Sequence, residues 1–206
     1  MRSAPFLNGM ATPANDVGVP GALPAAAAGW ERLEALALPF TDPRMKFAYR
    51  YWGRKAAGRP MPRRADIDPA EIPKLLPDVM LVDVTPEARY RYRLIGTENA
   101  RAHGINATGR YLDEVLPGPE YKAHVIGLYD ECVRKARPLY SECLFLSPER
   151  AAAERHTKVL FLPLSQDGDC VNIVFVVQVF VYIAQTTRDR HFLDAPPYRE
   201  ITHILL

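Results

Sequence analysis

Cysteine is scarce in this sequence, and the three cysteines that it has lie far apart. Among 206 residues there are only Cys132, Cys143 and Cys170, with no C-x-x-C pair. A sparse, odd-numbered set of this kind does not predict a disulfide framework. We therefore expect a reducing compartment, in which the cysteines act as small buried apolar residues.

A long hydrophobic run is also missing. The most apolar stretch, residues 171–184, contains Asn172 and Gln178 and is too short to span a bilayer. The N-terminal residues lack the basic region followed by an apolar segment that export needs. Together these absences predict a soluble, cytoplasmic protein.

Neither sign of charge dominates the chain. Its 26 Lys and Arg against 24 Asp and Glu give a net charge of +2. Without an excess of positive charge, the sequence does not predict a nucleic-acid partner. Hydrophobic residues make up 48% of the chain, which is enough for an ordinary globular core.

Catalytic and metal-binding motifs are absent as well. There is no G-x-S-x-G turn and no glycine-rich phosphate loop. The histidines at 156, 191 and 203 have no zinc-site spacing with each other or with cysteine. We therefore expect neither an enzyme nor a metal site, and the sequence identifies no cofactor.

The N-terminal part divides into two segments. Residues 1–29 are rich in Ala and Pro and nearly free of charge, which predicts a disordered leader. Residues 30–77 are expected to hold flanking helices. The first helix follows the capping pair Asp42-Pro43 and stops at Gly58. A second, short helix runs from Asp68-Pro69 to about Leu76.

Eight basic residues and no acidic one lie between Arg44 and Arg64. On the helix predicted over 43–57 they mostly lie opposite an apolar stripe. A basic amphipathic helix can bind anionic lipid or an acidic partner. The interpretation that we favour is that the basic face of this helix is solvated and that nearby acids balance its charge. The apolar stripe of the helix would then cover a sheet. A membrane-surface partner is therefore not expected.

Residues 78–184 have the pattern of a mixed core, followed by a tail over 185–206. Two strands at 79–84 and 90–95 form a hairpin. Short helices at 96–118 and a longer helix at 119–136 follow. Three strands come last, at 139–146, 157–164 and 171–183, with a polar loop at 147–156. This order predicts an α+β fold with a five-stranded antiparallel sheet and helices on one face.

The last strand has one wholly apolar face and one mixed face. Its odd positions from Val171 to Ile183 are all apolar, so we expect them to face the main core. Its even positions are mixed, so helix 43–57 or a second subunit is expected to cover that face. Asp83 and Arg93 are expected to pair across the hairpin.

Dispersed short motifs accompany this element order. They are Tyr51-Trp52, Pro62 with Arg64, residues 65–69, 75–77, 81–83 and 91–97, Thr108-Gly-Arg110 with Leu112, Arg137-Pro138, and 162–165 with Gly168. In order and spacing the chain resembles the PAS domain family, specifically the stand-alone PAS_5-type proteins of alphaproteobacteria. The resemblance implies a five-stranded sheet that cups short helices. It also implies small-ligand binding in the cup and signalling through dimer contacts and flanking helices, with no settled cofactor and no catalytic residues.

The resemblance and the apolar patterns suggest candidate residues for the cup. These are His103, Tyr129, Cys132, Phe145, Leu160, Leu162 and Phe175. His103 could ligate a haem iron or hold a ligand, or simply end a helix before Gly104. Cys132 could attach a ligand such as a flavin, or only pack in the core. His124 falls outside the apolar arc of its helix, so we expect it to be solvated.

A second set of residues is a candidate partner or dimer interface: Met45, Tyr49, Trp52, Phe180 and Tyr182. The first hypothesis for function is a sensory or regulatory module in signal transduction. It would be homodimeric and would respond to a small molecule or a signalling partner. The alternative is a ligand-free interaction scaffold whose cup is filled by its own side chains.

Overall fold

A computed structural model describes residues 38–146, 153–182 and 198–206 of the chain. The predicted leader over residues 1–29 lies outside the described residues. So do the polar loop at 147–152 and the first part of the predicted tail.

Helix α2, Pro43–Ala56, forms as its capping residues predict. The Asp42 side chain accepts a hydrogen bond from the Arg44 amide at 2.9 Å. Ala57 ends the helix in the left-handed conformation, with φ 49°. The next segment contains three short 3-10 helices, η1 (Arg64–Asp66), η2 (Pro69–Glu71) and η3 (Leu76–Asp78), where we expected one helix over 68–76. Prolines at 73 and 77 remove the amide donors that a continuous helix would need.

The sheet is antiparallel, as predicted, but it has six strands where the sequence predicted five. In spatial order they are β2 (Tyr90–Ile95), β1 (Val79–Val84), β5 (Ile173–Tyr182), β4 (Ala153–Leu164), β3 (Leu139–Leu146) and β6 (Tyr198–Leu205). Strand β6 lies in the segment that we had predicted to be a tail, and it pairs with β3. Strand β4 begins at Ala153 and takes in residues that we had expected in a loop.

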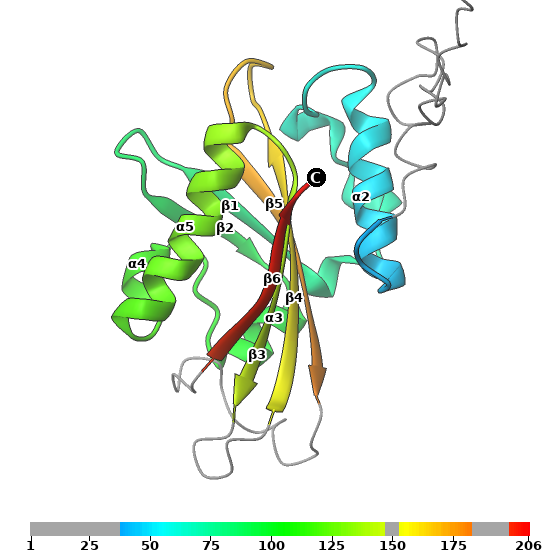
Figure 1. The fold of residues 1–206 in the computed structure, drawn as a ribbon. Helices are drawn as coiled ribbons and strands as arrows, with labels where there is room; N and C mark the ends of the chain where they lie inside the picture. Colours follow the sequence, from blue (N-terminus) through cyan, green and yellow to red (C-terminus); the bar gives the residue numbers. More distant parts are fainter. Residues whose placement is uncertain (1–37, 147–152, 183–197) are drawn as a thin grey trace, which may run out of the picture.

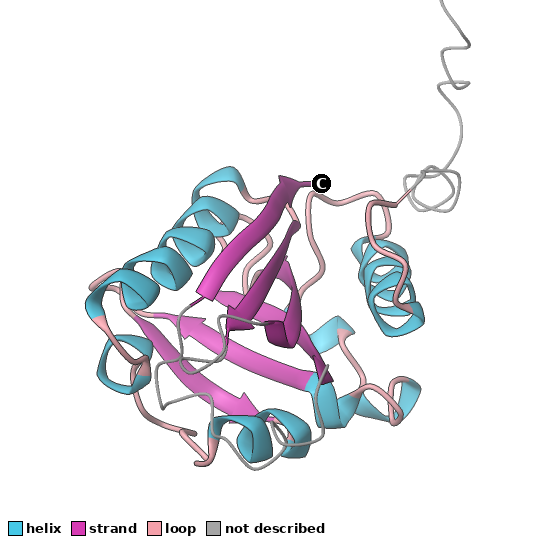
Figure 2. Cartoon of the chain, turned by 60° about the horizontal axis from the view of Figure 1, so that its bottom comes forward, coloured by secondary structure: helices cyan, strands magenta, loops and turns pink. Residues whose placement is uncertain are grey.

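Helices cover both faces of this sheet. Helices α3 (Thr97–His103), α4 (Leu112–Val115) and α5 (Pro119–Lys135) lie on one face, which we call the inner face. Helix α2 and the 3-10 segments cover the other, outer face. Figures 1 and 2 show α5 and α2 on opposite sides of the strands. Trp52 on α2 donates a buried hydrogen bond of 2.8 Å to the Pro163 carbonyl on β4.

Alternation along the strands separates two hydrophobic clusters. On β5, Val174 and Val176 pack toward α5, whereas Phe175 and Val177 pack toward α2. The prediction that the odd positions of this strand face the cup was therefore wrong, since they face α2 instead. Helix α2 does cover one face of this strand, but that face carries the odd positions, so the expectation that α2 or a second subunit covers the even positions was also wrong.

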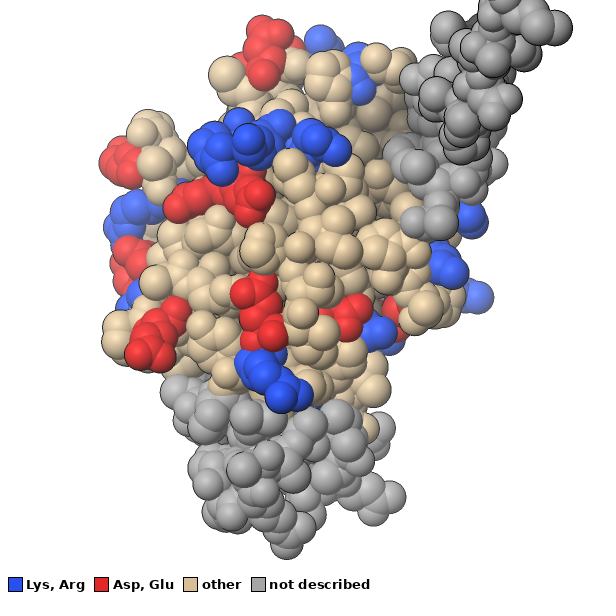
Figure 3. Space-filling view, viewed as in Figure 1, with Lys and Arg blue, Asp and Glu red and all other residues tan. Residues whose placement is uncertain are grey.

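In the basic segment around α2, Arg44, Lys55 and Arg59 form ion pairs with acids. Arg44 lies 3.1 Å from Asp78, and Lys55 lies 2.7 Å from Glu71. Arg93 and Asp83 pair across the hairpin at 2.6 Å, as predicted. On the face seen in Figure 3, acidic and basic side chains lie in small adjoining groups. This arrangement agrees with a solvated, charge-balanced face.

Candidate ligand-binding cup

A cavity of about 40 Å³ lies between α5 and the inner face of the sheet. Its walls come from the five strands β1 to β5, from α3 and α5, and from the segment after α4. The lining residues are Met80, Tyr92, His103, Leu116, Tyr121, His124, Val125, Leu128, Tyr129, Ser141, Cys143, Phe145, Thr157, Val159, Phe161 and Gln178. The free space suits a few water molecules or a very small ligand, since drug-sized ligands occupy about 300–1,000 Å³.

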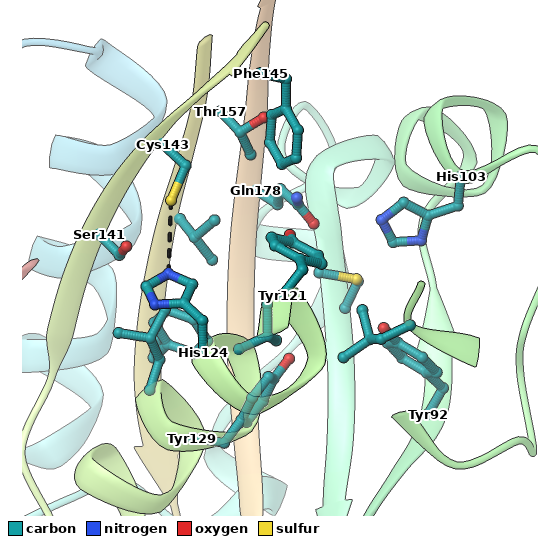
Figure 4. Close-up of a pocket in the computed structure, with 16 residues that line it drawn as sticks. Tyr92, His103, Tyr121, His124, Tyr129, Ser141, Cys143, Phe145, Thr157 and Gln178 are labelled. Carbon is teal, nitrogen blue, oxygen red and sulfur yellow. Dashed lines mark hydrogen bonds between the residues drawn. The ribbon is translucent and has the colours of Figure 1, made fainter. Parts of the chain in front are cut away.

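Strand alternation aims the polar side chains inward. Ser141, Cys143 and Phe145 are successive inward positions of β3, and Thr157 on β4 is the register partner of Cys143. Gln178 enters from β5. In Figure 4, His103 and Tyr92 lie on one side of the cavity, Cys143 and His124 on the other, and Tyr121 between them.

Three tyrosines place hydroxyl groups in this lining. Burial raises the pKa values of Tyr92, Tyr121 and Tyr129 above the usual tyrosine range. Tyr92 and Tyr121 also raise the pKa of Tyr129 electrostatically, as close neighbours do. All three phenols therefore stay protonated at neutral pH and can donate hydrogen bonds.

His103 is a neutral imidazole in this environment. Its side chain is buried, and burial lowers its pKa to about 4. The positive charge of Arg155 lowers the pKa further, whereas a hydrogen bond with Gln178 opposes the shift. At neutral pH His103 therefore brings no positive charge into the cavity.

A buried guanidinium lies behind the same end of the cavity. Arg155 is 4% exposed and stands over the rings of Phe145 and Phe180, at 5.0 Å and 5.6 Å from their centroids. Beside it on β4, the Thr157 hydroxyl is buried and has no hydrogen-bond partner among the described residues. A buried hydroxyl without a partner is energetically costly and marks a place where a ligand or water would bind.

His124 contradicts the prediction that it is solvated. Its Nε2 lies 3.6 Å from the Cys143 sulfur, and its Nδ1 lies 3.8 Å from the Glu200 carboxylate on β6. The side chain is only 15% exposed. Strand β6, which sequence reasoning missed, brings Glu200 and Tyr198 against this face of α5.

The structure brings together only part of the predicted cup. His103, Tyr129 and Phe145 line the cavity. Cys132 is fully buried in the inner cluster but does not line the cavity. Leu160, Leu162 and Phe175 were placed on the wrong face of the sheet, because they pack against α2 in the outer cluster.

The candidate interface residues are distributed differently from the prediction. Met45, Tyr49 and Trp52 are 0%, 3% and 6% exposed and pack on the outer face of their own sheet. They are therefore not available to a second subunit in this fold. Phe180 lies against His103 at 6.4 Å between ring centroids, and Tyr182 stacks on Phe180.

Several cavity residues were missed by sequence reasoning. Ser141, Cys143, Thr157, Gln178 and Tyr121 all line the cavity. Polar residues spaced by two within otherwise apolar strands are the signal that could have found the strand members. The position of Tyr121 depends on how α5 is docked, and no local pattern specifies that.

Among the described residues, no group of three His, Cys, Asp or Glu side chains is arranged to hold a metal ion. The cavity in this arrangement is also far too small for haem or flavin. The haem and flavin alternatives for His103 and Cys132 therefore find no geometric support. No helix in the described part of the chain is both long and apolar enough to cross a membrane.

One comparison with known proteins gives a match. The model of the PAS_5 family, described as a PAS domain, matches residues 41–177. This range runs from the cap of α2 through the first half of β5 and includes most of the cavity lining. A search of curated proteins finds no match.

Proposed function

We propose that this chain, which belongs to the PAS_5 family of PAS domains, is a sensory and regulatory module in signal transduction. PAS domains are generally sensory rather than catalytic, and we propose no catalytic role for this one. The observation that carries the proposal is the cavity between α5 and the sheet, with polar groups from several elements around one small space.

The proposed mechanism is a shift between two arrangements of the elements around the cup. Helix α5 and strand β3 both line the cavity, and β3 carries the edge strand β6. His124 joins them, because it contacts Cys143 in the cavity and faces Glu200 on β6. A ligand that favours one position of α5 would therefore change the surface formed by β6.

The same cavity supports one second candidate, a ligand-free scaffold. Its free space of about 40 Å³ is far below that of a typical ligand pocket, so the inner side chains nearly fill the cup. In that case the module would act through its surface, and the cup would serve only the stability of the fold.

We also propose a homodimer, since PAS domains often dimerise. The apolar stripe of α2 is buried, so the contact must use another surface. Strand β6 lies at one edge of the described sheet and exposes Ile201 and Ile204, at 48% and 36%. An open strand edge with apolar side chains can pair with a second copy of the chain. Light scattering of the wild type and of Ile201→Glu tests this: we expect a dimer that the substitution weakens, and a monomeric wild type contradicts it.

Native mass spectrometry of freshly purified protein tests the sensory proposal. We expect one small molecule per chain, bound at purification or taken up from a metabolite mixture. Ser141→Leu fills the cavity from β3 and should abolish uptake, whereas Ser141→Ala at the same position should keep it. If no molecule binds, and Ser141→Leu leaves amide hydrogen exchange in α5 and β6 unchanged, the scaffold candidate replaces the sensory one.

A further inference from the structure

The proposed sensory cup also carries information about the chemistry of its ligand. Building on the proposed function, we propose that the cavity binds a short-chain aliphatic monocarboxylate, of the size of acetate to butyrate. The carboxylate would lie at the Thr157 end, and the short aliphatic tail would lie among the apolar residues.

The size of the cavity sets the first limit. One water molecule needs about 10–15 Å³ of cavity volume, so a cavity of about 40 Å³ holds a few non-hydrogen atoms. Small rearrangements of Leu128 or Val125 on α5 would add room for one or two methylene groups. Fused-ring cofactors and nucleotides are an order of magnitude too large.

Hydrogen-bond donors define the second limit. Tyr92, Tyr121 and Tyr129 line the cavity and their hydroxyls remain protonated, so each can donate. The Thr157 hydroxyl is buried without a partner among the described residues. A carboxylate has two oxygens with about four acceptor positions, so it can accept hydrogen bonds from several donors at once.

The charges around the cavity decide whether an anion or a neutral acceptor binds better. Among the described lining residues there is no Asp or Glu. The Arg155 guanidinium lies behind Phe145, close enough to act electrostatically on two lining residues, His103 and Tyr121. The electrostatic field at this end of the cavity therefore favours a negative group. Inside the cavity, where water does not screen it, this field attracts an anion more strongly than a neutral molecule.

The rest of the lining is apolar and suits a hydrocarbon tail. Val159 and Phe161 rise from β4 toward Leu128 on α5. A cationic or strongly polar tail would lose its hydration there without compensation. The structure therefore points to a compact acid with one charged head and a short apolar tail.

Calorimetric titration and thermal unfolding of the full chain, with acetate, propionate and butyrate as probes, test the proposal. We expect saturable 1:1 binding and a rise in Tm. Neutral propionamide should bind at least about tenfold more weakly, because hydrogen bonds to a charged group are the stronger kind. Octanoate should not fit.

Substitutions locate the site. Thr157→Val keeps the shape of the side chain and removes the hydroxyl, and should weaken propionate binding by about tenfold or more. Thr202→Val on β6 makes the same change at a strand position whose register partner, Glu142, does not line the cavity. It should leave binding unchanged. Arg155→Met should weaken propionate more than propionamide.

Each outcome has a distinct meaning. Equal binding of propionate and propionamide, or equal losses in Thr157→Val and Thr202→Val, overturns the carboxylate assignment. If the probes fail to bind but native mass spectrometry finds another small molecule in the cup, the carboxylate inference fails and the sensory function stands. If nothing of any class binds, both fail, and only ordered water occupies the cavity.

Discussion

The imidazole of His124 on α5 lies within 3.6 Å of the Cys143 sulfur on β3, inside the cup. The other ring nitrogen faces Glu200, 3.8 Å away on the last strand of the sheet. One side chain thus connects the cavity, helix α5 and the strand at one edge of the described sheet. This contact makes α5 and β6 the elements in which we look for a response to ligand.

The three cysteines are expected to react at very different rates. Burial raises the pKa of Cys143 to about 11 and that of Cys132 to about 12, so their thiolates are rare at pH 8. Cys170 is exposed. Peptide-mapped iodoacetamide labelling at pH 8 should modify Cys170 at least about tenfold faster than the other two. Fast labelling of Cys143 would show that the cup opens far more than this structure does.

Stability should fall as the pH drops from about 6.5 to about 4. The folded protein holds the pKa of His103 at about 4, whereas in the unfolded chain it is near 6.5, the ordinary value for histidine. Between these values the unfolded state binds the additional proton, so the free energy of unfolding rises with pH. The full contribution, on the order of 3 kcal/mol, is present above about pH 6.5.

His103→Gln should flatten this dependence, as measured by urea unfolding across the pH range. His124 will leave a smaller slope of the same sign, because burial lowers its pKa too. An unchanged profile in His103→Gln would contradict the assignment of a neutral, buried imidazole.

Gly96 is expected to tolerate no side chain. A Cβ added there would lie 2.3 Å from the Leu76 carbonyl oxygen and 2.4 Å from that of Pro77. Gly96→Ala should therefore lower the free energy of unfolding by about 1–3 kcal/mol, through displacement of backbone.

Gly127, on the exposed side of α5, is the matched control, because a Cβ there meets nothing within 4 Å. Gly127→Ala should raise stability by about 0.5–1 kcal/mol, since alanine loses less backbone entropy in a helix. Chemical denaturation of both variants decides the matter, and equal effects would refute the close approach at Gly96.

Trp52 is expected to stabilise the packing of α2 against the sheet. Its indole donates a buried 2.8 Å hydrogen bond to the Pro163 carbonyl. Trp52→Phe keeps an aromatic ring but leaves that carbonyl unpaired, at a cost of about 1–3 kcal/mol. Phe47→Leu, on the exposed side of the same helix, should cost less than about 1 kcal/mol. A loss in Trp52→Phe no larger than this would mean that the hydrogen bond adds little.

Local signals made most elements predictable. Asp42-Pro43 set the start of α2, and the strands at 79–84 and 90–95 have the bounds read from their apolar patterns. Pro119 begins α5 in the same way, directly after Gly118. These signals act through backbone dihedrals and neighbouring side chains, so they need no tertiary context.

Strand β6 was not predictable by the same means. Arg199, Glu200 and Ile201 are exposed, and Thr202 is half-buried. An edge strand with little burial has no clear alternation of apolar and polar residues. Pairing with β3 defines it, and that partner lies more than fifty residues away in the sequence.

The sequence by itself determined the family, the α+β class, and the fact that both faces of β5 carry apolar side chains. Tertiary structure alone decided which face of β5 lines the cup. Alternation divides a strand into two sets of side chains but cannot say which set meets α5 and which meets α2. When both sets contain several apolar side chains, as on β4 and β5, only the docking of the helices makes the distinction. That docking placed Leu160, Leu162 and Phe175 behind the sheet, and it brought His124, Thr157 and Gln178 into the cavity.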